Sequence, residues 1–359
     1  GGAYEETAVL YRSNAQSRAI EEALLRISIP YRIYGGLRFY ERLEIKNAIA
    51  YLKIIFNNND NPSFERSISN PTRGVGEKTL GKIRQTAQKY NISYIKASAK
   101  LIDEGSISGR GGSGLRDYLE FIAGCKSFIE DNSLSDLMEL IIKESGLYSY
   151  HAKEAGEKGK TRTENLEELI TATKNFEQSV KEDKTNTEIA ENYLDVISLD
   201  AGDRQAAEHD DAAQLMTMHS AKGLEFKLVL LTGLEESLFP HGRSMESASQ
   251  LEEERRLCYV AITRAMEKLY ITHAESRRLH GTDTFNPPSR FLREIPKDLI
   301  DEIRPRAQTN IPYNRKDFNE TKIEFEEEIG IALGQKVLHK KFGEGIVLNY
   351  EGSGDAARV

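Results

Sequence analysis

The feature that most constrains the fold is an uninterrupted apolar run at residues 228–231 (Leu-Val-Leu-Leu), which follows a polar turn containing Gly223. A run without polar alternation is typical of a strand buried on both faces of a parallel sheet. Such sheets carry their ligands on loops at strand ends, so the polar residues around this run are the first candidates for function. The chain is therefore predicted to be an α/β protein.

The order of patterns along the chain predicts an α/β domain interrupted by helices. Residues 7–12, 15–27 and 31–34 have the patterns of a strand, a helix and a short strand. Amphipathic helical patterns follow, and Thr161 with Glu164 predicts a capping box at the start of another helix. The amphipathic patterns lie at 44–55, 78–90, 115–129 and 134–145, separated by Gly/Ser-rich segments such as 105–114. The polar segment 178–213 is predicted to be a connection, and strands return at 215–219, 227–234 and 268–273.

Several blocks of the sequence resemble, in the same order, the motifs of the UvrD/PcrA/Rep helicases of superfamily 1. The blocks lie at residues 11–18, 30–36, 70–76, 161–169, 217–226, 252–264 and 341–345. The resemblance implies a DNA helicase that moves 3′ to 5′ along single strands by ATP hydrolysis and serves DNA repair. It also implies a RecA-like parallel-sheet domain, called 2A, that is interrupted by an all-helical insertion, called 2B.

The resemblance assigns five parts to the chain. Residues 1–36 and 210–303 would form domain 2A, and residues 37–209 would form domain 2B. Residues 304–330 lack periodicity and are predicted to be a linker. Residues 331–359 resemble the start of a Tudor-like barrel with about two strands, a truncated β tail that is too short to be stable alone.

One family element is absent from the sequence, because no segment has the phosphate-loop pattern G-x-x-x-x-G-K-[ST]. Residues 156–161 end in Gly-Lys-Thr, but the required first glycine is replaced by Glu154 and the preceding segment is polar. The chain is therefore expected to be the C-terminal half of such a helicase, with the ATP and Mg²⁺ site completed by an absent nucleotide-binding domain.

Composition limits the kinds of partner. The net charge of −8 over 359 residues excludes a uniformly basic surface, so DNA contacts must come from local patches. No run of 18 apolar residues suggests a membrane span. The two cysteines, Cys125 and Cys258, lack companions at metal-ligand spacing, so neither a metal site nor a disulfide is expected and a cytoplasmic location fits.

Three residues are expected to contact the nucleotide. Arg264 matches the family's arginine finger, which stabilises charge on the γ-phosphate during transfer. Glu225, after Gly223, matches the residue that accepts a hydrogen bond from the ribose. The alternatives are a helix-terminal arginine that offsets the helix dipole and an ordinary acid of a surface loop.

The expected DNA-contacting residues fall into three groups. Hydroxyl, imidazole, amide and guanidinium groups after two strands are typical donors to single-strand phosphates. A Gly-x-Gly turn before a helix exposes backbone N–H groups to a duplex phosphate, although it is also a common interhelical turn. The single-strand group is Arg12, Asn14, Thr217 and His219; the duplex group is Thr72, Arg73, Gly74, Gly76 and Lys78, with a second segment of Thr161, Arg162, Thr163 and Asn165.

A hairpin is predicted after the strand at 268–273, with Gly281 at its tip. The family places at this tip an aromatic residue that stacks on the last base pair of the duplex. The matching residue is His280, where tyrosine is expected, and a solvated turn residue is the alternative.

Two competing functions are considered beside the helicase. An ATP-independent DNA- or protein-binding adaptor would have no use for the residues that match an arginine finger and a ribose ligand, Arg264 and Glu225. A helicase-nuclease would need a metal-dependent nuclease domain, which residues 304–359 do not contain. The expected partners are single-stranded DNA, duplex junctions and repair proteins, with no membrane.

Overall fold

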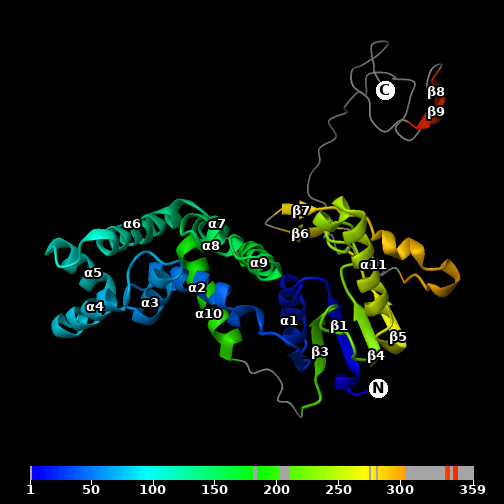
Figure 1. The fold of residues 1–359 in the computed structure, drawn as a ribbon, viewed down its shortest axis with the longest axis horizontal. Coiled ribbons are helices and arrows are strands. Elements are labelled where there is room, and N and C mark those ends of the chain that lie inside the picture. The colour runs from blue at the N-terminus through cyan, green and yellow to red at the C-terminus, as the bar shows by residue number, and fades with distance from the viewer. Residues whose placement is uncertain are drawn as a thin grey trace, which may run out of the picture. The chain divides into compact units, whose positions relative to one another are not determined.

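The computed structural model describes residues 2–180, 184–202, 210–274, 276–279, 282–303, 336–339 and 343–346. The chain divides into two compact units, residues 1–300 and 301–359 (Figure 1). The first unit contains the α/β sheet and the helices that interrupt it.

The sheet is parallel and is assembled from segments far apart in the sequence. Its strand order is β2-β3-β1-β4-β5. Ala8 of the central strand β1 pairs with Gln214 on one side and with Val229 on the other. The strands are β1 (Thr7–Tyr11), β2 (Tyr31–Ile33), β3 (Ala213–Thr217), β4 (Phe226–Leu231) and β5 (Ala265–Ile271).

Helices cover both faces of this sheet, as the apolar run in β4 predicts (Figure 1). Val9 and Tyr11 point to the face covered by α1 (Ser17–Arg26). Ala8 and Leu10 point to the opposite face, where α11 (Ala248–Ile262) packs. Alternate residues of one strand thus belong to two different apolar clusters, which is the pattern of a strand inside a three-layer α/β/α fold.

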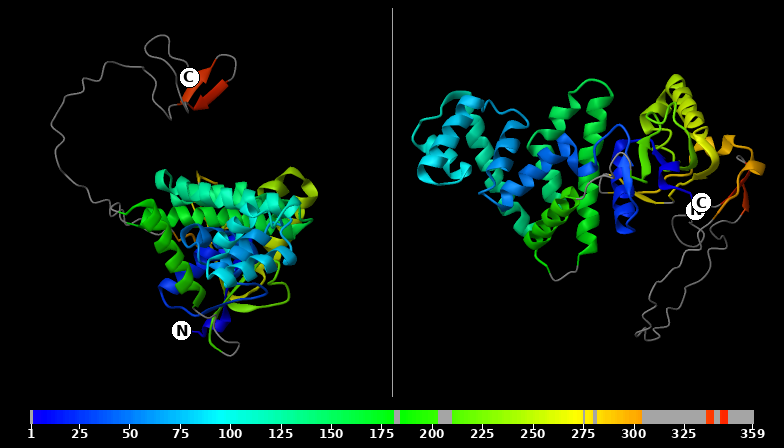
Figure 2. Two further views of the ribbon diagram at one scale, coloured as in Figure 1. Left: turned by 90° about the vertical axis from the view of Figure 1, so that its left-hand side faces the viewer. Right: turned by 90° about the horizontal axis from the view of Figure 1, so that it is seen from below.

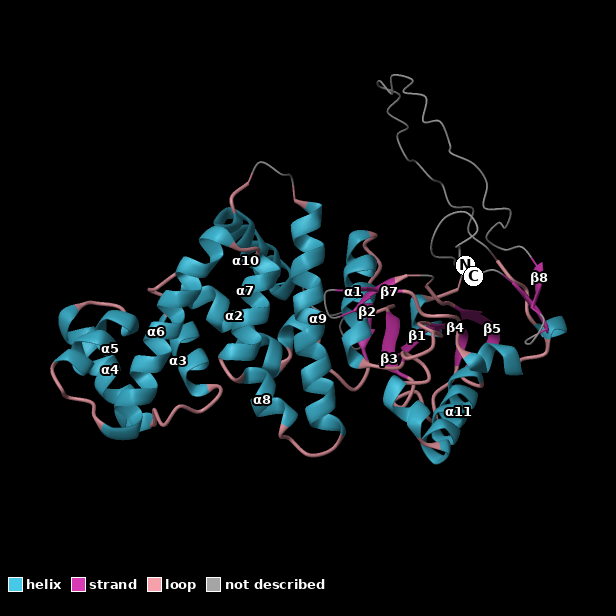
Figure 3. Ribbon diagram, turned by 90° about the horizontal axis from the view of Figure 1, so that it is seen from above, coloured by secondary structure: helices cyan, strands magenta, loops and turns pink. Residues whose placement is uncertain are grey.

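The helices between β2 and β3 share a separate apolar core, which extends from Phe39 to Ile197 (Figures 2 and 3). Each helix is amphipathic and buries its apolar face against its neighbours. The helices are α2 (Leu43–Phe56), α3 (Asn61–Ser69), α4 (Glu77–Tyr90), α5 (Tyr94–Asp103), α6 (Gly109–Asp131), α7 (Leu134–Glu144), α8 (Leu147–Ala152), α9 (Glu157–Ser179) and α10 (Asn186–Gly202).

The structure corrects three local predictions in this helical part. Helix α9 begins at Glu157, so the capping box predicted at Thr161 is wrong. The connection predicted at 178–213 contains α10. The glycine-rich segment 105–114, predicted to separate two helices, is helical from Gly109 onward and forms the first turns of α6, because its glycines permit close packing. A Cβ added at Gly114 would lie 2.0 Å from the carbonyl oxygen of Arg73.

The predicted hairpin is confirmed. Strand β6 (Arg277–Leu279) pairs antiparallel with β7 (Thr282–Thr284), while the hairpin tip, residues 280–281, lies outside the described residues.

In the second unit, β8 (Lys336–His339) pairs antiparallel with β9 (Gly343–Ile346), and the linker predicted at 304–330 lies outside the described residues. Across the described ranges, every helix is too short or too polar to cross a bilayer.

Candidate functional site

The parallel sheet separates the candidate residues into two groups at opposite edges. Gly223 and Glu225 immediately precede β4, and Arg264 immediately precedes β5, so these three lie at the edge formed by the amino ends of the strands. Arg12 and Asn14 follow β1, and Thr217 and His219 end or follow β3, at the carboxyl edge. The sequence motifs alone did not distinguish these two edges.

Arg264 is held beside the loop that contains Gly223 and Glu225. Its Nη1 donates to the carbonyl oxygen of Leu224 at 2.9 Å, and its Nε donates to the carbonyl oxygen of Val260 at 2.9 Å. The backbone carbonyl of Arg264 also accepts a hydrogen bond from the N–H of Phe226 at 2.9 Å. These contacts fix the guanidinium but do not neutralise it, because no carboxylate of the described residues forms an ion pair with it.

The loop beside Arg264 is open to a ligand. Gly223 has a φ of +88°, and no atom lies within 4 Å of the position that a Cβ would occupy. Glu225 is exposed and forms no hydrogen bond with the described part of the chain. The amino edge therefore presents the Arg264 cation and the Glu225 carboxylate, neither of them in an ion pair with the residues described, beside the open backbone at Gly223. These groups fit one side of an ATP molecule, since the cation suits its phosphates and the carboxylate suits a ribose hydroxyl.

At the carboxyl edge, Arg12 is engaged with another residue of the protein. Its Nη2 and Nε donate to the carboxylate of Glu254 at 2.7 and 3.0 Å. Thr217 is also engaged, because its hydroxyl lies 3.0 Å from that of Ser220 and accepts the Ser220 N–H. The expectation that Arg12 and Thr217 offer free donors to DNA is therefore not supported by their conformation.

His219 is exposed at this edge, and Asn14 is half-buried but without a side-chain partner among the described residues. The Asn14 amide forms no hydrogen bond with the described residues, while its backbone carbonyl accepts from Arg42 at 3.0 Å. Partial burial of the His219 ring, and then the nearby charge of Arg12, lower the pKa of His219. The imidazole is consequently neutral at pH 7 and can donate one hydrogen bond without adding positive charge.

The Gly-x-Gly segment presents its backbone at the start of α4. Gly76 occupies the N-cap position with φ −97° and without a capping side chain, and no atom lies within 4 Å of the place that a Cβ would take there. Thr72, Gly74 and Lys78 are exposed nearby. The free N–H groups of this helix start are a suitable geometry for a phosphate.

Arg73 is an exception in this segment, because its guanidinium points into the protein. It donates to the carbonyl oxygens of Ser145 at 2.8 Å and Pro71 at 3.0 Å, and lies 5.5 Å from the ring centres of both Tyr51 and Tyr118. Arg73 therefore stabilises the turn in this conformation.

The sequence motifs missed Arg110, an exposed residue in the first turn of α6. A Cβ on Gly74 would lie 2.9 Å from the Cγ of Arg110, so this side chain lies directly over the Gly-x-Gly turn. A lone arginine inside the glycine-rich segment 105–114 was the available signal.

The second predicted duplex segment lies inside α9, and most of its polar groups are engaged. Asn165 is 1% exposed; its Oδ1 accepts from Arg42 at 2.9 Å and its Nδ2 donates to Glu44 at 2.6 Å. In this conformation the Asn165 amide is buried and its hydrogen bonds are made within the protein, so contact with DNA would require its release. The other members are engaged or only partly exposed: Arg162 donates to Glu154 at 2.5 Å, Thr163 donates to the Lys160 carbonyl at 2.9 Å, and Thr161 is partly exposed.

The hairpin that carries His280 is anchored by a buried ion pair. Arg277 donates to the fully buried carboxylate of Glu235 at 2.7 and 3.0 Å, and the N–H of Ala274 donates to it at 2.8 Å. Burial alone would raise the pKa of Glu235, but these hydrogen bonds outweigh it and lower the pKa. His280 itself lies outside the described residues.

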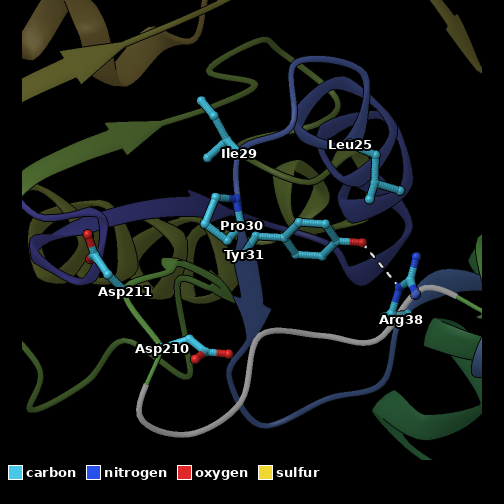
Figure 4. Close-up of a pocket in the computed structure, with 7 residues that line it drawn as sticks. All are labelled: Leu25, Ile29, Pro30, Tyr31, Arg38, Asp210 and Asp211. Atoms are coloured by element: carbon cyan, nitrogen blue, oxygen red, sulfur yellow. Dashed lines mark hydrogen bonds between the residues drawn. The ribbon is translucent and has the colours of Figure 1, made fainter.

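A separate pocket lies beside β2 and contains none of the candidate residues (Figure 4). Arg38 donates to the hydroxyl of Tyr31 at 3.2 Å there, and Asp210 and Asp211 give the lining more acids than bases. A lining with an excess of acids disfavours phosphate ligands. Within the described ranges, no three His, Cys, Asp or Glu side chains are grouped to hold a metal ion.

Comparison with known proteins identifies the relatives of this chain. The model of the UvrD-like helicase C-terminal domain matches residues 1–106 and 121–276. DNA helicase II of Escherichia coli (strain K12) is 46% identical over the whole chain, and ATP-dependent DNA helicase PcrA of Staphylococcus aureus (strain Mu50) is 38% identical over 97% of it. The chain spans about half the length of these relatives, 49% and 48% respectively. The chain belongs to the family of UvrD-like helicase C-terminal domains.

Proposed function

We propose that this chain is the C-terminal portion of an ATP-dependent DNA helicase that moves 3′ to 5′ along single-stranded DNA. The observation that carries the proposal is the position of Arg264, whose unpaired guanidinium is fixed beside Gly223 and Glu225 at one edge of the sheet. The relatives are named as DNA helicases and match 97% or more of the chain, which supports the same assignment.

At the amino edge, Arg264 supplies positive charge to the γ-phosphate and Glu225 accepts a hydrogen bond from the ribose. ATP, with Mg²⁺, supplies the phosphoryl group when it is bound between this edge and a domain that carries a phosphate loop. In the proposal, Gly223 keeps the loop backbone accessible to the nucleotide. This chain thus contributes charge stabilisation and nucleotide orientation.

At the carboxyl edge, Asn14 and His219 donate to the phosphates of single-stranded DNA. Arg12 and Thr217 support this surface through their bonds to Glu254 and Ser220. In the helical insertion, Thr72, Gly74, Gly76 and Lys78 contact a duplex, and Arg110 joins them. His280 at the hairpin tip stacks on the last base pair.

In the same proposal, residues 1–36 and 210–303 form the sheet domain and residues 37–209 form the helical insertion. The separate apolar cores of the sheet and the helices support these boundaries. A cytoplasmic location and DNA-repair partners also belong to it. An ATP-independent adaptor is disfavoured, because it would have no use for the unpaired Arg264 and Glu225 at one edge.

The 359-residue chain alone is expected not to hydrolyse ATP, since its sequence contains no phosphate-loop lysine. Phosphate release should be measured with the purified chain, ATP, Mg²⁺ and single-stranded DNA. The complete helicase, meaning this chain joined to its phosphate-loop half, is the control. DNA-stimulated ATP hydrolysis by the chain alone would contradict the proposal that the ATP site is completed by a second domain.

Gly76→Val is expected to weaken duplex binding by on the order of fivefold, because the new side chain obstructs the free N–H groups of α4. The open space at Gly76 means that the fold should be retained. Gly81→Val is the matched control, since Gly81 lies in the same helix with equally open space but away from its start. Phosphate contact at Gly76 would be excluded if both variants lost the same affinity for duplex DNA. It would also be excluded if the duplex affinity of the wild type did not change between roughly 50 and 200 mM salt.

A further inference from the structure

Glu254 is a buried acid on the helix that leads to Arg264. It lies in the second turn of α11, and the helix ends at Ile262, two residues before Arg264. Its carboxylate accepts hydrogen bonds from Arg12 at 2.7 and 3.0 Å, from the N–H of His241 at 3.3 Å and from the hydroxyl of Ser244 at 3.4 Å. Burial would raise the pKa of Glu254, but the bonds from Arg12 outweigh it and lower the pKa, so the acid is ionised at neutral pH.

Helix α11 joins the two edges of the sheet as one packed element. Glu254, in the second turn, bonds to Arg12 at the carboxyl edge, and Arg264 follows the end of the helix at the amino edge. Between them, Leu257, Cys258 and Ala261 are buried in the apolar cluster of the sheet. The nine residues from Glu254 to Ile262 span roughly 13 Å, and packing along this length makes them one element that can carry a displacement from one edge to the other.

Arg12 belongs to the turn that presents Asn14. The backbone N–H groups of Arg12 and Ser13 both donate to the side-chain oxygen of Gln16, at 3.0 and 2.8 Å. A shift of this turn therefore moves Arg12 with it. Arg12 bonds to the Glu254 carboxylate through two nitrogens, which fixes the relative geometry of the two side chains. A movement of Arg12 is therefore expected to displace Glu254 and, with it, α11.

We propose that Glu254 is a positioning residue that couples single-stranded DNA at the carboxyl edge to the placement of Arg264 at the amino edge. This inference rests on the proposed function. Glu254 touches neither ligand; it holds Arg12 on one side and sets the position of α11 on the other. The competing explanation is that Glu254 only stabilises the fold.

The test uses Glu254→Gln in the complete helicase, which keeps the side-chain shape and removes the charge. ATP hydrolysis is measured with and without saturating oligo-dT. The ratio of stimulated to unstimulated kcat should fall by roughly 5- to 150-fold, the usual range of coupling between two sites. Glu253→Gln is the matched control, because Glu253 is the preceding residue of α11 and its side chain is 72% exposed. This control should keep the wild-type ratio.

A double-variant comparison separates positioning from simple stabilisation. In an Arg264→Ala background, Glu254→Gln should change the ratio by less than about twofold, since its effect acts through Arg264. Three results would overturn the inference: a full additional loss in the double variant, an unchanged ratio in the single Glu254→Gln variant, or an equal fall of the stimulated and unstimulated kcat that follows a loss of thermal stability. If Glu254→Gln does not fold, Arg12→Lys breaks the same two-nitrogen contact, and an unchanged ratio in that variant would overturn it. A wild-type protein without DNA-stimulated hydrolysis would overturn the proposed function as well.

Discussion

Arg264→Ala is expected to lower the kcat of ATP hydrolysis in the complete helicase by on the order of 10³-fold or more. The guanidinium is held by neutral carbonyl oxygens, so its whole charge is available to the transferring phosphoryl group. Because Arg264 lies at the edge opposite Asn14 and His219, the affinity for single-stranded DNA should stay nearly unchanged. Steady-state ATPase and DNA-binding titrations measure the two quantities.

Arg256→Ala is the matched control for this variant. Arg256 lies in the same helix, but its side chain is 74% exposed and pairs with Glu253. A surface pair of this kind contributes little, so the control should keep the wild-type kcat. A wild-type kcat in Arg264→Ala, or an equal loss in the control, would remove Arg264 from the catalytic role.

Asn165→Ala is expected to lower the free energy of unfolding by about 2–4 kcal/mol. The substitution removes the amide that bonds to Arg42 and Glu44, both of which are buried, and leaves two charged groups under-satisfied. Urea unfolding followed by circular dichroism measures the loss. Thr161→Ala in the same helix should change the stability by no more than about 0.5 kcal/mol, because no described contact depends on the Thr161 side chain.

A different result would support the predicted contact between Asn165 and duplex DNA. If Asn165→Ala kept the wild-type stability and lost duplex affinity, the amide would have to face DNA in the working conformation. The structure predicts that stability changes first, and that any loss of DNA binding follows the unfolded fraction.

The sheet was predictable because its signal is local. The apolar run at 228–231 and the short strand patterns before residue 35 and after residue 212 predicted strands of one parallel sheet, and the structure has them in one. The helices α3, α5 and α8 were missed, since they are short and their apolar residues follow no long periodic pattern. The start of α6 was misread because its glycines serve close approach to residues 73 and 74, a tertiary cause that sequence patterns do not contain.

The candidate residues were predictable as a set, but their individual orientations were not. Arg12, Arg73 and Arg162 are all basic residues in polar motifs, and each proved to be engaged by a carboxylate or by backbone carbonyls. Partners such as Glu254 lie as many as 242 positions away in the sequence. Only the fold brings such partners together, so the sequence does not distinguish an arginine that pairs with a carboxylate, such as Arg12, from one that is held by neutral oxygens, such as Arg264.

The most direct test of the central claim is strand separation by the complete helicase. Duplexes with a single-stranded tail at the 3′ end or at the 5′ end should be compared, with ATP and Mg²⁺, and with Arg264→Ala as the inactive reference. The account predicts rapid unwinding of the 3′-tailed duplex alone, and none with the variant. Unwinding without ATP, unwinding of the 5′-tailed duplex only, or equal rates for wild type and Arg264→Ala would contradict it.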